Sequence, residues 1–355
     1  MLQFGPCALD VCTPSAFGGA VALRTSAIGV SAATGPLLGG VLVAHFGWQA
    51  VFWINVPVAL LLAAFTLALR VPVPSSRAAG PQRLDLTGAV LLAGALAVLV
   101  HTLSGVPAYG WGAARTLFGL AVAAVASAGF GVHEHRAAYP IVPAAVARSV
   151  PVTASMVMLL VSGGAMFGAL FATTFHLQDV LGLDALASGM RVMPMTALMV
   201  LGAPVASRAL RRYGACRTAV VGVALVSAAL AALALTLTGA GPAGPAGAWV
   251  AFGLLGAGFA TVMVTTTETV VGDAPSGYAG VVGGLKQTAM NIGPVFGIAV
   301  AASLMPSRSA AFRDAFVLTP TLSVLPGLAA LGLVPALLLP GGQTRGRKFA
   351  SADRT

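Results

Sequence analysis

The sequence predicts an all-α protein that crosses a membrane many times. Of its 355 residues, 58% are hydrophobic and only 8% are charged, whereas soluble domains carry about 25% charged residues. The mean hydropathy is +0.94, and the apolar residues gather in runs of about 20, the length that a helix needs to cross the hydrocarbon core. Because backbone in lipid must satisfy its own hydrogen bonds, we expect each run to be a helix.

Ten apolar runs are long enough to cross the bilayer. They lie at 20–44, 50–70, 86–105, 113–132, 152–176, 186–207, 217–238, 248–270, 280–304 and 317–339. Residues 1–18 lack a basic leader and a long apolar core. This segment therefore predicts neither a signal peptide nor a spanning helix.

The basic residues between the runs predict the orientation. The net charge is +10, but the charges stand in short clusters between apolar runs, which is typical of cytoplasmic loops and argues against a nucleic-acid partner. The even-numbered connections and the C-terminal tail hold Arg70, Arg77, Arg83, Arg136, Arg148, Arg208, Arg211, Arg212, Arg217, Arg345, Arg347, Lys348 and Arg354, and the odd-numbered ones hold Arg115, Arg308 and Arg313. Both termini are therefore expected in the cytoplasm, although the connection at 272–277 has no basic residue.

A glycine and proline motif ends the first run. Gly35, Gly39 and Gly40 would let another helix approach closely, and Pro36 removes an amide donor and bends the helix. Ordinary small-residue packing explains the same spacing. A short aromatic segment follows, and then Asn and Pro open the next run.

The stretch GPLLGGVLVAHFGWQAVFWINVPV at 35–58 resembles the antiporter motif of the fourteen-helix drug:proton antiporters of the major facilitator superfamily. The resemblance implies that the first two runs match that family's helices five and six. It also implies that the runs at 86–105 and 113–132 match the two extra helices between its six-helix halves. It extends to about residue 340, so ten of fourteen helices are expected, with an N-terminal truncation.

A second motif supports two related halves. The ninth run carries Gly293, Pro294 and Gly297, echoing the first motif in the helix that would be its repeat partner.

A basic motif connects the sixth and seventh runs, with Arg208, Arg211, Arg212, Gly214 and Arg217. It is similar to the superfamily's basic loop in its second copy. That loop ordinarily has Asp where this chain has Arg211, which argues against a charge-paired gate. A loop that only sets the orientation is the alternative.

Ionisable residues inside membranes are costly and point to function. Glu268 ends the eighth run, and a carboxyl in a low-dielectric cavity can exchange protons near neutral pH. Arg191 opens the sixth run beside the acidic residues Asp179 and Asp184, where a cavity charge and an interfacial anchor are both possible. Arg24 is expected to anchor the first run, and His101, His176 and Gln178 are expected at the interface. For Glu268, the alternative to proton exchange is that its side chain extends to the water at the membrane surface.

Polar residues on the ninth run could share one face of a cavity: Lys286, Gln287 and Asn291. Polar packing between helices explains them equally well. His133-Glu134-His135 predicts a solvated helix end, because adjacent residues on a helix point in different directions. We expect no metal, no cofactor and no catalytic residues.

The sequence thus predicts proton-coupled efflux of amphipathic small molecules across a bacterial inner membrane, with the lipid bilayer, protons and the substrate as partners. Its expected segments are a non-membrane piece at 1–18, a remnant of the first bundle at 19–70, linker helices at 71–150, a second six-helix bundle at 151–340 and a basic tail at 341–355. The alternatives are an inactive fragment, an exporter of an endogenous metabolite and, with the least support, a membrane enzyme or assembly subunit.

Overall fold

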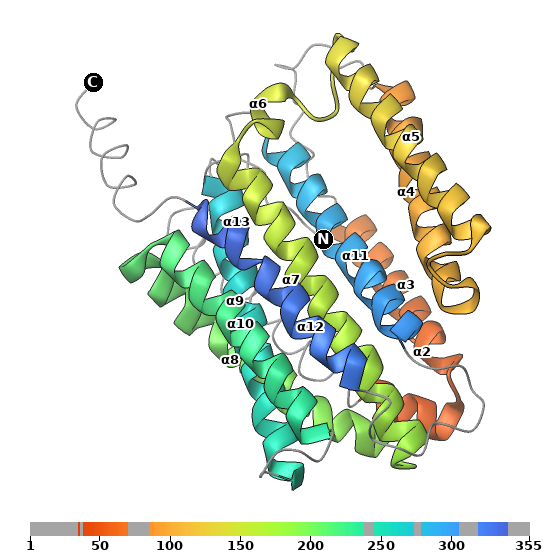
Figure 1. The fold of residues 1–355 in the computed structure, drawn as a ribbon, viewed down its shortest axis with the longest axis vertical. Coiled ribbons are helices and arrows are strands. Elements are labelled where there is room, and N and C mark those ends of the chain that lie inside the picture. Colours follow the sequence, from red (N-terminus) through yellow and green to blue (C-terminus); the bar gives the residue numbers. More distant parts are fainter. Residues whose placement is uncertain are drawn as a thin grey trace. The chain divides into compact units, whose positions relative to one another are not determined.

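The regular elements of the chain are helices in a computed structural model that describes residues 35, 38–69, 85–237, 244–272, 278–304 and 319–339 (Figure 1). Within these ranges, eight helices are long and apolar enough to cross a membrane. They confirm eight of the ten expected runs. Of the first run only the end is described, and the tenth forms two shorter helices.

A helical segment at 38–46 precedes the named elements. The elements are α2 (Ala50–Trp53), α3 (Asn55–Leu69), α4 (Leu86–Tyr109), α5 (Ala114–Arg136), α6 (Ala144–Ala147), α7 (Val150–Phe175), the π-helical turn η2 (His176–Val180), α8 (Ala185–Tyr213), α9 (Ala215–Leu237), α10 (Gly244–Gly272), α11 (Ala279–Leu304), α12 (Thr319–Leu331) and α13 (Leu333–Leu337).

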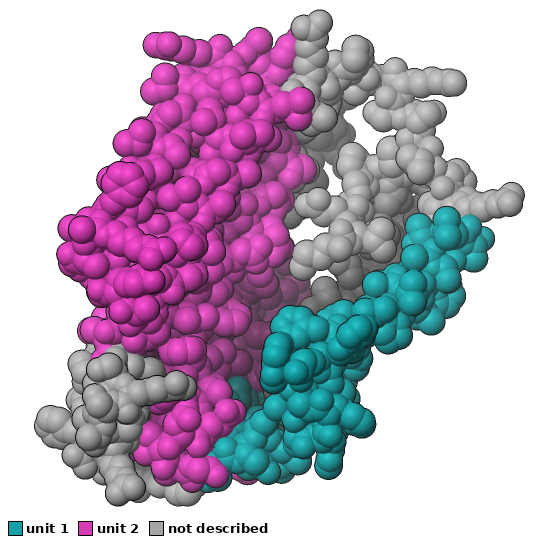
Figure 2. Space-filling model, turned by 90° about the vertical axis from the view of Figure 1, so that its right-hand side faces the viewer, with its two compact units in different colours: residues 1–82, 183–193 teal, residues 83–182, 194–355 magenta. Residues whose placement is uncertain are grey.

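The chain divides into two compact units (Figure 2). The first comprises residues 1–82 and 183–193. Within it, the start of α8 approaches the motif of the first run. A Cβ added to Gly40 would lie 3.2 Å from the Cα atom of Leu186 and 3.3 Å from the carbonyl oxygen of Ala185. A glycine therefore allows this approach of the two backbones.

The second unit comprises residues 83–182 and 194–355. Its longest packing interfaces pair α7 with α11 and α9 with α10, and α12 packs on both α7 and α9. The hairpin of α4 and α5 contacts α11 through α4, as Figure 1 shows. The core is built of small and flexible apolar side chains, among them Met158, Leu159, Val223 and Val262, all of which are fully buried.

Several helices extend beyond the apolar runs that predicted them. The sixth run was expected to end at residue 207, but α8 continues to Tyr213 and α9 begins at Ala215. Arginine favours helices as strongly as most apolar residues do, so a basic segment can prolong a helix past its apolar run. The basic connection is therefore a tight turn at Gly214 rather than a loop.

Candidate transport site

A glycine seam joins α7 to α11 and sets the spacing of the helices around the site. Gly164 and Gly168 of α7 face Gly293 and Gly297 of α11. A Cβ at Gly164 would lie 2.8 Å from the Gly293 carbonyl oxygen, and one at Gly168 would lie 2.6 Å from that of Gly297. The motif of the ninth run is therefore a packing seam. Sequence analysis missed its partners, although Gly164 and Gly168 have the four-residue spacing that signals such contacts.

Pro294 lies within this seam, inside α11. Its Cδ atom would lie 3.8 Å from a Cβ added to Gly163. The proline removes one backbone donor from the helix. At the other copy of the motif, no atom of the described residues lies within 4 Å of a Cβ added to Gly35 or Gly39, and Pro36 lies outside the described residues.

A polar contact connects α10 and α11. The Lys286 ammonium of α11 donates to the hydroxyl oxygen of Thr267 on α10 across 2.6 Å. The Thr267 hydroxyl in turn donates to the Met263 carbonyl across 2.6 Å. Both side chains are half-buried. An interhelical hydrogen bond of this kind holds a cation inside an otherwise apolar bundle.

Glu268 follows Thr267 on α10 and is half-buried. The carboxyl-bearing residue is thus adjacent in the chain to the hydroxyl that Lys286 binds. Glu268 and Lys286 thus place ionisable groups of both signs on the neighbouring helices α10 and α11, and such groups are rare within membrane-spanning helices.

Three further polar residues lie along α11 beside Lys286. The Gln287 amide donates to the Asn291 side-chain oxygen across 3.4 Å, which confirms that the four-residue spacing places them on one face. The Thr288 hydroxyl donates to the Gly284 carbonyl across 3.0 Å. Asn291 is exposed, whereas Gln287 and Thr288 are half-buried. This polar edge could contact a ligand.

Buried hydroxyls extend the polar interior. The side-chain oxygens of Ser155 and Ser162 on α7 and of Thr265 on α10 have no hydrogen-bond partner within the described part of the chain. All three side chains are fully buried. Buried polar atoms ordinarily find partners, so these hydroxyls mark positions where water or a ligand group could bind. Serines inside an apolar run offered only a weak signal in the sequence.

His176 is buried, which its expected place near a helix end did not indicate. Its side chain is only 5% exposed, and Nδ1 has no hydrogen-bond partner among the residues that the structure describes. It opens η2, and π-helical turns are frequent at functional sites. Gln178 and His101 are exposed, as expected of interfacial residues. A histidine at the end of a spanning run gives no sequence signal of its burial.

Arg191 belongs to the first unit and is half-buried on α8. The Asp184 carboxylate accepts a hydrogen bond from the Ala187 amide across 2.6 Å and so caps this helix. Arg191 and Asp184 are both described, and no ion pair joins them. Arg24 lies outside the described residues.

The basic motif forms the turn between α8 and α9. Gly214 has φ +82°, a left-handed conformation that favours glycine, and its amide donates to the Leu210 carbonyl across 3.0 Å. Arg208, Arg211, Arg212 and Arg217 are all exposed. The Arg212 guanidinium lies 5.3 Å from the centre of the Tyr213 ring. Within the described ranges Arg211 forms no ion pair, consistent with the absence of the usual Asp.

The His133-Glu134-His135 segment joins elements of the second unit. His133 pairs with Asp85 across 2.9 Å, and the Glu134 carboxylate accepts a hydrogen bond from the Val142 amide. Asp85 also caps α4 by accepting from the Gly88 amide across 2.9 Å. Adjacent side chains thus point to different partners, as helical geometry requires. The sequence did not predict these contacts.

The long apolar helices define a polytopic helical membrane protein. The chain belongs to the Major Facilitator Superfamily, whose family model matches residues 5–298. This bears out the expected membership of that superfamily and indicates a transporter rather than an enzyme.

Curated relatives are resistance and export proteins. The chain is 42% identical to the tetracenomycin C resistance and export protein of Streptomyces glaucescens over 295 residues, 83% of this chain and 54% of that protein. It is 28% identical to the multidrug resistance protein Stp of Mycobacterium tuberculosis, over 81% of this chain and 52% of that one. It is 32% identical to the methylenomycin A resistance protein of Bacillus subtilis, over 61% and 45%. The chain spans about half the length of the relatives it matches.

Proposed function

We propose that the chain is part of a proton-coupled drug exporter of the bacterial plasma membrane. The observation that carries this proposal is the contact of Lys286 with Thr267, next to Glu268, inside an apolar helix bundle. Ionisable groups within membrane-spanning segments are typical of proton and substrate pathways. The resistance and export proteins among its relatives support the same conclusion.

Glu268 is the proposed proton carrier. Gaining or losing a proton there changes the local charge by one unit beside the Lys286–Thr267 contact. Electrostatic effects are strong in a medium of low dielectric constant, so the change would bias the α10–α11 interface between two arrangements. Gln287 and Asn291 would supply polar contacts to the substrate. Arg191, in the other unit, is proposed separately as a substrate or proton contact. The glycines of the α7–α11 seam would let the packed helices shift together.

The proposed substrate is an amphipathic drug with a large apolar surface; tetracenomycin C, in the name of the Streptomyces glaucescens relative, is the first compound to test. Apolar contacts discriminate weakly between molecules, so broad selectivity follows from the composition of the bundle. In this proposal both termini are cytoplasmic. Residues 151–340 form the second bundle, 71–150 the linker helices and 19–70 part of the first bundle.

Dye transport by everted membrane vesicles tests the proposal. Because their cytoplasmic face points outward, vesicles from cells producing the chain should accumulate a lipophilic dye when their interior is made acidic, and a protonophore should stop this movement. Glu268→Gln should reduce the movement to the level of vesicles without the chain. Glu134→Gln is the matched control, because Glu134 lies at the end of α5 and its role as an acceptor is retained. Equal dye transport by the Glu268→Gln variant and the unchanged chain would show that Glu268 is not the proton carrier.

A further inference from the structure

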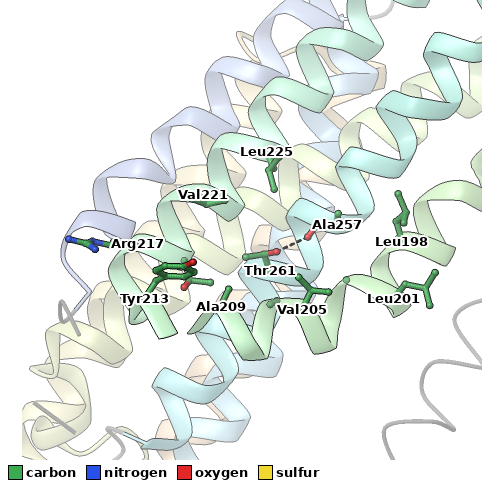
Figure 3. A pocket seen from close by; sticks show the side chains of 13 residues that line it. Leu198, Leu201, Val205, Ala209, Tyr213, Arg217, Val221, Leu225, Ala257 and Thr261 are labelled. Carbon is green, nitrogen blue, oxygen red and sulfur yellow. Dashed lines mark hydrogen bonds between the residues drawn. The ribbon is translucent and has the colours of Figure 1, made fainter. Parts of the chain in front are cut away.

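The second unit carries a groove of ≈ 720 Å³ between α8, α9 and α10 (Figure 3). Leu198, Leu201 and Val205 of α8 line it from one side, and Val221 and Leu225 of α9 from the other. Leu201 is 66% exposed, Val205 61% and Val221 55%. Exposed apolar side chains on membrane-spanning helices need an apolar occupant beside them.

The two threonines in the groove do not make it polar. The Thr218 hydroxyl donates to the Gly214 carbonyl across 2.8 Å, and the Thr261 hydroxyl donates to the Ala257 carbonyl across 2.8 Å. Each hydroxyl proton therefore takes part in a hydrogen bond within its own helix or turn. The remaining surface along the groove favours hydrocarbon over a polar ligand.

One end of the groove is different, because it carries positive charge. Figure 3 shows Tyr213 and Arg217 at this end and Leu198 and Leu201 at the other. Arg212 adds a second guanidinium, 5.3 Å from the centre of the Tyr213 ring. Neither arginine has an ion-pair partner in the described part of the chain. Apolar side chains thus line most of the groove, and Arg217 and Tyr213 line one end of it. The Arg212 guanidinium lies beside the Tyr213 ring.

We infer that this groove binds an anionic phospholipid, with one acyl chain along α8 and the phosphate at Arg217 and Tyr213. The α8 wall from Leu198 to Tyr213 covers about 22 Å at about 1.5 Å per residue. That length exceeds the half-thickness of the hydrocarbon core, about 15 Å, so an acyl chain of one leaflet fits along it. Charge complementarity selects the occupant, because a cationic drug would meet like charges at Arg217.

Binding of two lipids that differ only in the headgroup tests this inference. The full chain is purified in a neutral detergent and titrated with dioleoylphosphatidylglycerol or dioleoylphosphatidylcholine, and bound lipid is counted by native mass spectrometry. A basic residue at the membrane surface favours an anionic lipid by about fivefold. We therefore expect phosphatidylglycerol to bind at least about fivefold more tightly. Equal affinities would overturn the inference, and this comparison requires no variant.

Variants locate the site. Arg217→Gln should lower phosphatidylglycerol binding to the level of phosphatidylcholine, whereas Arg148→Gln, at an exposed arginine before α7, should not. Ala209 lines the groove, so Ala209→Trp should weaken the binding of both lipids, whereas Ala228→Trp on an exposed position of α9 should weaken neither. Equal losses in the variants and their controls would show that the lipids bind elsewhere and would overturn the inference. Dye efflux is measured separately, so a failed efflux proposal leaves this test intact.

Discussion

Gly297 of α11 packs directly on Gly164 of α7, so closely that a Cβ at Gly297 would overlap the Gly164 carbonyl group. The contact repeats one turn away, where a Cβ at Gly293 would lie 2.5 Å from the Leu160 carbonyl oxygen. Lipid tails are as apolar as leucine side chains, so helices in a membrane associate through close packing and polar contacts. The seam is therefore a main source of contact between these two helices.

Gly297→Ala should destabilise the protein because its methyl group would overlap backbone that cannot rotate away. We expect a loss of about 1–3 kcal/mol in the free energy of unfolding, measured by steric trapping in bicelles. Gly284→Ala on the same helix is the control, since no atom of the described part of the chain lies within 4 Å of its added Cβ. The control should be neutral or stabilising by up to about 1 kcal/mol. Equal effects of the two substitutions would contradict a stabilising role for the close packing of Gly297 on Gly164.

Thr267→Val should weaken the contact between α10 and α11 because it removes the hydroxyl that accepts a hydrogen bond from the Lys286 ammonium. Interhelical hydrogen bonds in membranes contribute about 0.6 kcal/mol on average and up to about 1.7 kcal/mol. We expect a loss in this range in the free energy of unfolding. Thr288→Val removes a hydroxyl that donates only to its own helix, and it should change stability by less than about 0.5 kcal/mol. If Thr288→Val lowered the free energy of unfolding as much as Thr267→Val, the hydrogen bond between Lys286 and Thr267 would not be a source of stability.

The hydrogen-exchange protection of the first turn of α4 should decrease at acidic pH. The Gly88 amide, followed by His133, lowers the pKa of Asp85 below its ordinary value of 3.8. A carboxyl whose pKa is lower in the folded state contributes stability that is complete above the unfolded value. That stability is lost as the pH falls through the folded value.

Hydrogen exchange of the α4 amides, corrected for intrinsic rates, measures this dependence. Protection of Gly88 and its neighbours should be constant above about pH 5 and should fall once the pH drops below 3.8. In the Asp85→Asn variant the side chain can still accept a hydrogen bond but does not titrate, so its profile should be flat. A wild-type profile as flat as that of the variant would exclude the proposed linkage.

Gly214→Ala should strain the turn between α8 and α9, where φ is +82°. A left-handed conformation costs a residue with a side chain about 1–2 kcal/mol, and the loss should appear in the free energy of unfolding. Gly214→Asn should cost less because asparagine tolerates this conformation. Gly131→Ala, in open space on α5, is the control and should not destabilise the protein. A result in which Gly214→Ala is harmless would mean that the helices can meet through another turn.

The sequence predicted which segments form helices, but it did not predict the residues at which those helices end. Eight apolar runs correspond to the eight long apolar helices of the described residues. Hydropathy ends a run at the first charged residue, whereas a helix ends where its backbone turns. In α8 that difference runs from residue 207 to Tyr213, because Arg208, Arg211 and Arg212 fit a helix as well as apolar residues do.

The polar site was only partly predictable. Gln287 and Asn291 are four residues apart on one helix, so helical geometry alone placed them on one face, and their hydrogen bond confirms this. Lys286 and Thr267 belong to different helices, and the rotation and depth of each helix decide whether they meet. Local spacing carries no information about that register.

The amino-acid sequence by itself determined that the chain forms apolar membrane-spanning helices, because an unpaired backbone is too costly in lipid and the length of each run matches the bilayer. It also placed the glycine motifs and the ionisable residues on those helices. Only the tertiary structure decided that Gly297 meets Gly164, that Lys286 meets Thr267 and that His176 is buried. The physical reason is that contacts between helices depend on close packing over whole surfaces, which pairs residues far apart in the chain.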